Sequence, residues 1–184
     1  MSMEECIRDI MMNGIPSTFC DTVAMQSLFT LEQKGWTKKV IWKQSTVLDA
    51  SIGVFADEDI QKGETTMRYI NKKNLIILKS AEDLPPLTKN TIEYLQNFIF
   101  QIEDVCGFTI PGAGINHDGA RANHQLVKIS DNEVVGMAIK DVQKGEELVC
   151  DYAHFGLPPK WLIDYAWEHD IWKSLVFKGY NEYV

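Results

Sequence analysis

The sequence predicts an α+β protein with many short strands, helices at both ends and one helix inserted between strands. Short runs of β-branched and aromatic residues alternate with turns from about residue 40 onward. Apolar residues recur at helical spacing only near the two ends and in the middle of the chain. Turns interrupt the strands too often for a parallel sheet of repeating β-α-β units, so such a fold is excluded.

Helix signals stand near both ends of the chain. Residues 2–13 place apolar side chains at helical spacing and are followed by a glycine, which can end a helix. A second helix, capped near residue 17, is expected to end at Gly35. A closing helix is expected after Pro159, because proline fits the first turn of a helix. The N-terminal segment 1–39 is therefore expected to pack on the rest of the chain or to form a homodimer through its apolar face, made of Ile7, Ile10 and Met11.

The middle of the chain carries the strands and the inserted helix. One apolar stripe at helical spacing predicts a helix through 92–105, formed by Ile92, Leu95, Phe98, Ile99, Ile102 and Val105. Strands are expected on both sides of this helix, at 40–42, 54–56, 65–70, 75–78, 125–129 and 134–139.

Composition and charge restrict the classes of function. The 184 residues carry 18 basic and 26 acidic side chains, so the net charge is −8. This balance opposes direct nucleic-acid binding, which needs a basic face, but it allows a basic peptide as partner. The four cysteines are far apart and form no C-x-x-C pair, so neither a zinc cluster nor a disulfide framework is expected. We therefore expect no metal, no membrane span and an intracellular protein, either nuclear or cytoplasmic.

Three segments contain residues suited to binding and chemistry. The first contains Gly53, whose missing Cβ lets the backbone approach a ligand closely. The second is Asn116-His117, where an amide side chain offers both a donor and an acceptor to a zwitterionic ligand. The third ends at Tyr152, which carries a hydroxyl on a rigid ring. In full they read Ser45-Thr46-Val47-Leu48-Asp49-Ala50-Ser51-Ile52-Gly53-Val54-Phe55-Ala56, then Gly114-Ile115-Asn116-His117 followed by Asn123, then Gly145-Glu146-Glu147-Leu148-Val149-Cys150-Asp151-Tyr152.

In this order the three segments resemble the SET-domain family of S-adenosylmethionine-dependent protein-lysine methyltransferases. The resemblance covers residues 40–156, with a variable insert at about 75–112, and leaves 157–184 as a C-terminal helical segment. It implies a SET-domain fold of several small β-sheets with a pseudoknot. It also implies methyl transfer from S-adenosylmethionine to a lysine of a protein substrate, with a histone tail as one candidate and S-adenosylhomocysteine as product.

The resemblance implies a role for each residue of the site. Tyr152 is the expected catalytic residue, and Cys150 and Tyr69 are expected to line the lysine channel. The ring of His117 is expected to be structural, because in the family the main chain of this residue contacts the adenine. The expected contacts to the cofactor come from Ile52, Gly53, Asn116, His117, Tyr152 and Phe155.

Departures from the family pattern keep a second interpretation open. Ser51 replaces a glycine, Cys150 replaces an aromatic residue, and Asn123 stands seven residues after Asn116 where six is usual. The Cys-rich segments that bind zinc in many relatives are absent from this sequence. The alternative is a degenerate SET domain that acts as a binding or scaffolding module, in which Tyr152 is a structural residue and Cys150 fills space in the core.

Overall fold

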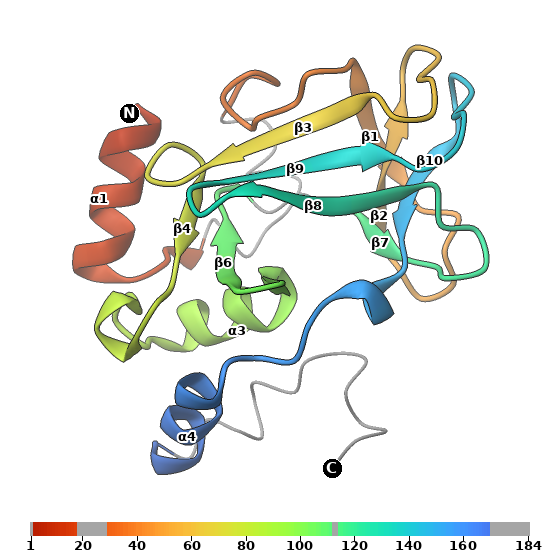
Figure 1. Ribbon diagram of the computed structural model, residues 1–184. Helices are drawn as coiled ribbons and strands as arrows, with labels where there is room; N and C mark the ends of the chain where they lie inside the picture. The colour runs from red at the N-terminus through yellow and green to blue at the C-terminus, as the bar shows by residue number, and fades with distance from the viewer. Residues whose placement is uncertain (1, 18–28, 112–113, 170–184) are drawn as a thin grey trace. The chain divides into compact units, whose positions relative to one another are not determined.

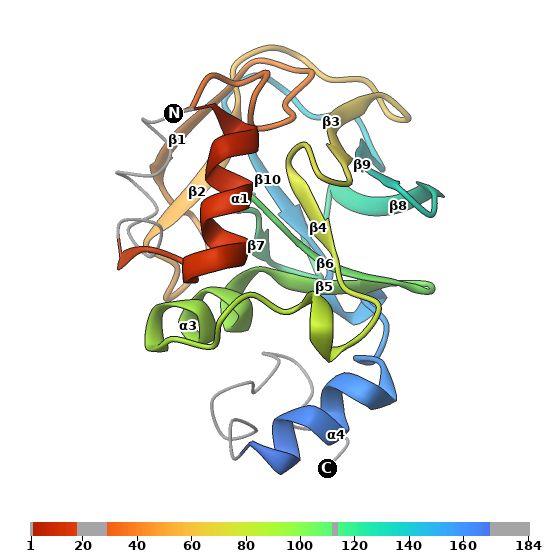
Figure 2. The same ribbon diagram turned by 90° about the vertical axis from the view of Figure 1, so that its left-hand side faces the viewer.

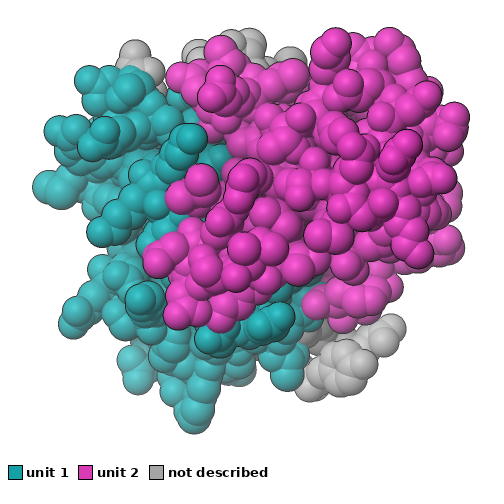
Figure 3. Space-filling view, turned by 45° about the horizontal axis from the view of Figure 1, so that its top comes forward, with its two compact units in different colours: residues 1–29, 71–112, 155–184 teal, residues 30–70, 113–154 magenta. Residues whose placement is uncertain are grey.

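The computed structural model describes residues 2–17, 29–111 and 114–169 (Figure 1). The chain folds into two compact units, each assembled from segments distant in the sequence (Figure 3). Unit 1 comprises residues 1–29, 71–112 and 155–184, and unit 2 comprises residues 30–70 and 113–154.

Unit 2 is built around a seven-stranded sheet. Its strand order is β1-β2-β10-β8-β9-β3, and β7 pairs with β10 beside this path. Figure 1 shows β3, β9 and β8 running side by side. The strands are β1 (Val40–Gln44), β2 (Ile52–Ala56), β3 (Thr65–Ile70), β7 (Asn116–His117), β8 (His124–Ser130), β9 (Glu133–Ala138) and β10 (Glu147–Cys150).

Strand β10 joins parts of the chain that antiparallel hairpins could not bring together. It pairs antiparallel with β2, and it pairs parallel with both β7 and β8. The loop between β7 and β8 therefore contacts β10 through both of its ends, with Val149 opposite Asn116 and Cys150 opposite His124. The 3-10 helix η3 (Tyr152–His154) follows directly. This crossing brings the second and third sequence segments together, as predicted.

Unit 1 combines a small sheet with the helices. The sheet order is β4-β6-β5, and Figure 2 shows α3 beside β5 and β6. Helix α1 begins with a capping box in which Ser2 and Glu5 bond each other's main-chain N–H. The elements are α1 (Met3–Asn13), β4 (Leu75–Ile77), η2 (Ala81–Asp83), α3 (Lys89–Phe98), β5 (Ile99–Ile102), β6 (Val105–Thr109) and α4 (Lys160–Glu168).

The prediction of one helix through 92–105 is wrong beyond Phe98. Helix α3 ends there, and the next residues form the antiparallel hairpin of β5 and β6, with Ile99 opposite Phe108. The helical stripe continued into Ile99, Ile102 and Val105 by coincidence, because a short apolar run fits a buried strand as well as a buried helix. Residues 100–102 of β5 are all buried, so side chains on both faces of this strand are covered, and pairing with β6 satisfies its main-chain hydrogen-bonding groups.

The apolar face of α1 covers the core of unit 1. Ile10 is buried in that core, and Ile7 and Met11 pack against it. A homodimer through the N-terminal segment would therefore need another surface. Of the second predicted helix, residues 18–28 lie outside the described residues, and residues 31–35 form turns. The closing helix begins at Lys160 after Pro159, as predicted. Among the described residues, no helix has the length and hydrophobicity needed to cross a membrane.

Candidate active site

Tyr152 lies at the start of η3, immediately beyond β10. Its hydroxyl donates a hydrogen bond to the carbonyl oxygen of Ile115 at 2.7 Å, so a side chain after β10 reaches back to the residue before β7. Burial raises the pKa of Tyr152 above its ordinary value of 10.0, with a smaller contribution from Cys150. The phenol therefore stays protonated at neutral pH. Because its one proton points at Ile115, the oxygen acts as an acceptor toward any further group.

His117 supports Tyr152 from β7. Its Nδ1 accepts a hydrogen bond from the main-chain N–H of Tyr152 at 3.0 Å, and the two ring centroids lie 5.1 Å apart. Asp151 lies nearby, with its Oδ1 3.9 Å from the same Nδ1. The ring of His117 thus orders the turn that carries Tyr152, while its main chain stays in the pairing of β7 with β10.

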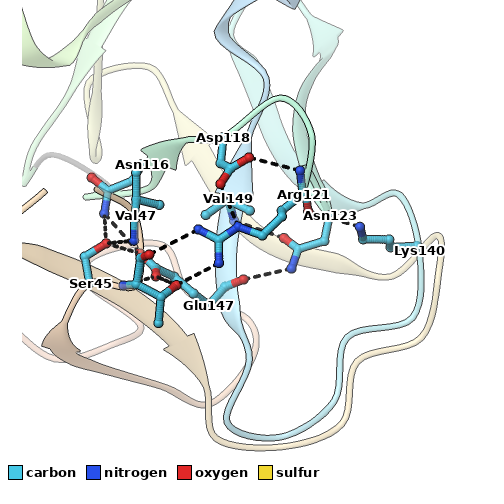
Figure 4. A network of polar contacts seen from close by, with 10 residues as sticks. Ser45, Val47, Asn116, Asp118, Arg121, Asn123, Lys140, Glu147 and Val149 are labelled. Carbon is cyan, nitrogen blue, oxygen red and sulfur yellow. Dashed lines mark hydrogen bonds and ion pairs between the residues drawn. The ribbon is translucent and has the colours of Figure 1, made fainter. Parts of the chain in front are cut away.

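Asn116 is held by its amide nitrogen (Figure 4). Nδ2 donates to the carbonyl oxygen of Ile52 at 2.8 Å, to Oγ of Ser45 at 3.1 Å and to Oε1 of Glu147 at 3.1 Å. Oδ1 points away from these three groups in Figure 4. An outward carbonyl oxygen can accept a hydrogen bond from an ammonium group, so this side chain fits the amino acid end of S-adenosylmethionine.

Glu147 is the centre of the network. The sequence predicts it to brace the strand and the crossing rather than to act in the chemistry, so it was not among the predicted site residues. It is 7% exposed, and its carboxylate accepts from Oγ of Ser45, from Oγ1 and the main-chain N–H of Thr46, and from Asn116. Burial alone would raise the pKa of Glu147, but the hydrogen bonds from Thr46, Ser45 and Asn116 outweigh it and hold this pKa below its usual value. The carboxylate is therefore ionised in a nearly closed site.

Gly53 makes room for this carboxylate. A Cβ at position 53 would lie 2.0 Å from Oε1 of Glu147, far inside van der Waals contact. The carboxylate of Glu147 thus occupies the space that the absence of a side chain at Gly53 leaves. Contact of its main chain with the cofactor stays a prediction, as does that of Ile52, whose carbonyl oxygen accepts from Asn116.

Asn123 and Arg121 brace the loop between β7 and β8. Asn123 is buried and bonds the main chain of β10 through both ends of its amide, to the Glu147 carbonyl and the Val149 N–H. Arg121 donates to Oγ1 and to the carbonyl oxygen of Thr46, and Asp118 orients its guanidinium. Asn123 stands one residue later than the family spacing, and in this position its side chain fastens the loop to β10.

Cys150 faces the interior of unit 2. Its Sγ lies 3.4 Å from Nδ1 of His124, whose Nε2 lies 2.7 Å from Oγ1 of Thr66. Burial raises the pKa of the Cys150 thiol to about 12 and lowers that of His124 to about 3, so both are neutral. Cys150 is 3% exposed, which accords with the interpretation that it fills space in the core. A role in the lysine channel stays a prediction.

The positions of Tyr69 and Phe155 do not test their predicted roles. Tyr69 lies on β3 opposite Val134 and is 1% exposed. Phe155 belongs to unit 1, three residues beyond Tyr152, and is half-buried. Their predicted contacts with lysine and cofactor remain predictions. Among the described residues, no three His, Cys, Asp or Glu side chains lie together in a way that could hold a metal ion.

The comparison with protein families decides the assignment. The family model described as SET domain matches residues 51–153, more than half of the 184 residues. The chain belongs to the SET-domain family. Members of this family are protein-lysine methyltransferases. The match covers the second and third sequence segments and the first from Ser51 onward, and it ends at the residue after Tyr152.

Solved structures similar to this SET domain include a candidate histone methyltransferase and a Polycomb Repressive Complex. A Plasmodium falciparum protein named as a candidate histone methyltransferase is 22% identical, with a TM-score of 0.45, and the match covers 64% of this chain and 96% of that one. Polycomb Repressive Complex 2 of Chaetomium thermophilum, autoinhibited and bound to S-adenosylmethionine, is 24% identical, with a TM-score of 0.46, and the match covers 70% and 17%. The same complex with H3K27me3 and H3K27M is 25% identical, with a TM-score of 0.46, and the match covers 62% and 14%.

The SET domain is a small part of these Chaetomium chains, of which the matches cover 14% to 17%. No curated protein was found to match the sequence.

Proposed function

We propose that this chain transfers methyl groups from S-adenosylmethionine to a lysine side chain of a protein substrate. The observation that carries the proposal is the placement of Tyr152, whose hydroxyl proton is committed to the Ile115 carbonyl and whose main-chain N–H is committed to His117. Two hydrogen bonds and a ring contact hold this hydroxyl in one position. A fixed acceptor of this kind suits a reaction that depends on alignment.

The chemistry assigned to Tyr152 follows from its protonation state. S-adenosylmethionine supplies an electrophilic methyl group on a sulfonium. In the transfer a nitrogen–carbon bond forms as the sulfur–carbon bond breaks, S-adenosylhomocysteine leaves, and the amine later loses a proton to solvent. Because burial raises the pKa of the phenol, Tyr152 does not serve as the base. It accepts a hydrogen bond from the neutral amine and directs the nitrogen lone pair.

Asn116 and the neighbouring main chain would hold the cofactor. The outward Oδ1 of Asn116 can accept from the cofactor's ammonium group, while its Nδ2 is already used by Ser45, Ile52 and Glu147. The main chain of His117 would contact the adenine. These residues lie together in unit 2, and no metal takes part in the proposed reaction.

The proposed substrate is a basic protein segment, with a histone tail as the first candidate. The chain carries a net charge of −8, and a negative surface favours encounter with Lys/Arg-rich peptides. The family assignment supports a protein lysine as the methyl acceptor, without selecting a particular one.

The test begins with titration calorimetry of the purified chain with S-adenosylmethionine. Incubation with methyl-labelled cofactor, mixed core histones and cell extract follows, and mass spectrometry locates any methylated lysine. Binding together with transfer supports the proposal. Absence of binding at millimolar cofactor overturns it, and stoichiometric zinc in the purified protein overturns its metal-free part. Binding without transfer to any substrate would instead assign the chain as a binding or scaffolding module.

A further inference from the structure

The carboxamide of Asn116 has two possible orientations, and its neighbours select one. Oγ of Ser45 accepts from Nδ2 of Asn116 while donating its own proton to Oε1 of Glu147 at 2.7 Å. The other two neighbours of Nδ2, the Ile52 carbonyl and the Glu147 carboxylate, can only accept. A flipped amide would place Oδ1 against these acceptors. The network therefore requires nitrogen inward and oxygen outward (Figure 4).

Glu147 contributes a charge that the other two acceptors lack. It is 7% exposed, and within the described part of the chain it forms no ion pair with a Lys, Arg or His side chain. Hydrogen bonds to an ionised acceptor are about twice as strong as neutral ones. A charged acceptor on Nδ2 also polarises the amide, which makes Oδ1 a stronger acceptor.

The surroundings of Glu147 are arranged to keep this charge in place. Gly53 leaves the space that the carboxylate fills, and Thr46 donates two hydrogen bonds to Oε2, at 2.7 Å from its main chain and 2.5 Å from its hydroxyl. Arg121 in turn holds the hydroxyl and carbonyl of Thr46. Oε1 is thereby left to face Ser45 and Asn116.

We propose that Glu147 is a positioning residue that locks the Asn116 carboxamide with its oxygen outward and makes this oxygen selective for the positively charged amino group of the cofactor. The selectivity rests on the proposed function, because it names the ligand group that Oδ1 receives. The orientation of the amide is a property of the protein alone.

The first experiment examines the orientation without cofactor. Side-chain NH2 signals of Asn116 are recorded by NMR in the wild type and in Glu147→Gln, with hydrogen exchange of the two protons. The wild type should show slowed exchange, and Glu147→Gln should lose about tenfold or more of that protection, because a charge-assisted bond is removed. The matched control is Glu146→Gln, which removes a neighbouring exposed carboxylate that accepts from the Gln143 main chain in its own turn. Equal protection in wild type and Glu147→Gln would overturn the proposal.

The second experiment examines selectivity. Affinities are measured for S-adenosylhomocysteine and for 4-(adenosylthio)butanoate, which lacks only the amino group. Glu147→Gln should weaken S-adenosylhomocysteine by about tenfold and the deamino compound by much less. An equal loss for both compounds would show that Glu147 is merely structural and would overturn the selectivity.

A folding defect and a failure of the proposed function can each be recognised. If Glu147→Gln does not fold, Glu147→Asp replaces it, because the shorter side chain keeps the charge but withdraws the carboxylate from Nδ2 of Asn116. Protection of the Asn116 NH2 protons should fall, and unchanged protection would count against the proposal. A wild type that binds neither compound overturns the proposed function and the selectivity, while the exchange measurement still decides the orientation.

Discussion

Nδ1 of His117 accepts the main-chain N–H of Tyr152 at 3.0 Å, and the planes of the two rings are inclined by 41°. An accepting Nδ1 requires a neutral imidazole whose proton lies on Nε2. The turn that carries the proposed catalytic hydroxyl is therefore held by the lone pair of a side chain that is half exposed.

Two substitutions of His117 separate the acceptor from the ring. In His117→Asn, the Oδ1 atom of the asparagine is bonded to Cγ, as Nδ1 of the histidine is. An acceptor is therefore kept at this position, and the ring is lost. In His117→Phe, the ring is kept and the N–H of Tyr152 loses its partner. We expect His117→Phe to lower the free energy of unfolding by about 0.5–1.5 kcal/mol and to slow methyl transfer more than His117→Asn does. Thermal unfolding and transfer rates are measured on both; the opposite ranking would show that the ring contact dominates.

Removal of the Tyr152 hydroxyl should affect the reaction more than the fold. Tyr152→Phe is expected to slow methyl transfer about 10²-fold or more, because a positioned polar group at the reacting centre is lost. Affinity for S-adenosylmethionine should change far less, since the proposed cofactor contacts lie on Asn116 and the main chain. The three measurements are transfer rate, cofactor affinity and melting temperature.

Tyr94→Phe is the matched control for this substitution. Tyr94 also donates its hydroxyl proton to a main-chain carbonyl at 2.7 Å, that of Thr109, but in unit 1. It should lose stability of about 1 kcal/mol without a selective loss of transfer. Equal transfer rates in Tyr152→Phe and wild type would remove Tyr152 from the mechanism.

Gly53→Ala should disrupt the site from within. The new Cβ would meet the Glu147 carboxylate at 2.0 Å, so strand β2 or the carboxylate must shift. We expect a loss of unfolding free energy of about 1–3 kcal/mol or more, together with weaker cofactor binding. Gly63→Ala is the comparison: it has open space around the new Cβ but a φ of +87°, so its cost of about 1 kcal/mol is backbone strain alone. Chemical denaturation of both variants measures the difference, and a Gly53→Ala protein as stable as Gly63→Ala would argue against the tight packing.

His124 should make stability depend on pH between about 5 and 6.5, above the range in which most carboxyl groups titrate. Burial lowers its pKa from the ordinary value of 6.5 to about 3, so the unfolded chain binds this proton between those values and the folded chain does not. The stability contribution is thus full above about pH 6.5 and falls by up to about 1.4 kcal/mol per pH unit as the pH drops toward 3. Urea unfolding at several pH values on wild type and His124→Gln measures the slope. The variant should have a shallower slope between pH 5 and 6.5, and parallel curves would contradict the assignment.

Five strands of unit 2, which are β1, β2, β3, β8 and β9, could be predicted because each lies between local turn signals, whereas β7 and β10 were not predicted. The run 65–70 matches β3 residue for residue, and 134–139 differs from β9 by one residue at each end. The inserted segment was predicted less well. Its apolar stripe continued past Phe98 at helical spacing, and the change to a strand became visible only through pairing with β6, which is a tertiary interaction.

The candidate site also combines features that the sequence predicted with features that only the structure revealed. Asn116, His117 and Tyr152 could be selected from motif order, because the resemblance assigns a role to each position. The place of Glu147 could not be derived in this way, since its partner Ser45 is 102 residues distant in the sequence. Gly53 was selected for a ligand's approach, whereas the structure shows the Glu147 carboxylate against it.

The amino-acid sequence by itself determined the α+β class, the family and the three segments that carry the site, because these follow from local turn chemistry and from the order of short motifs. Only the tertiary structure decided which atoms meet. The crossing of β10 with β7 and β8 turns Asn116 so that its nitrogen faces Glu147, and it brings the ring of His117 to the main chain of Tyr152. Hydrogen bonds of this kind depend on angles and distances between segments far apart in the chain, and a linear pattern of residue types does not contain them.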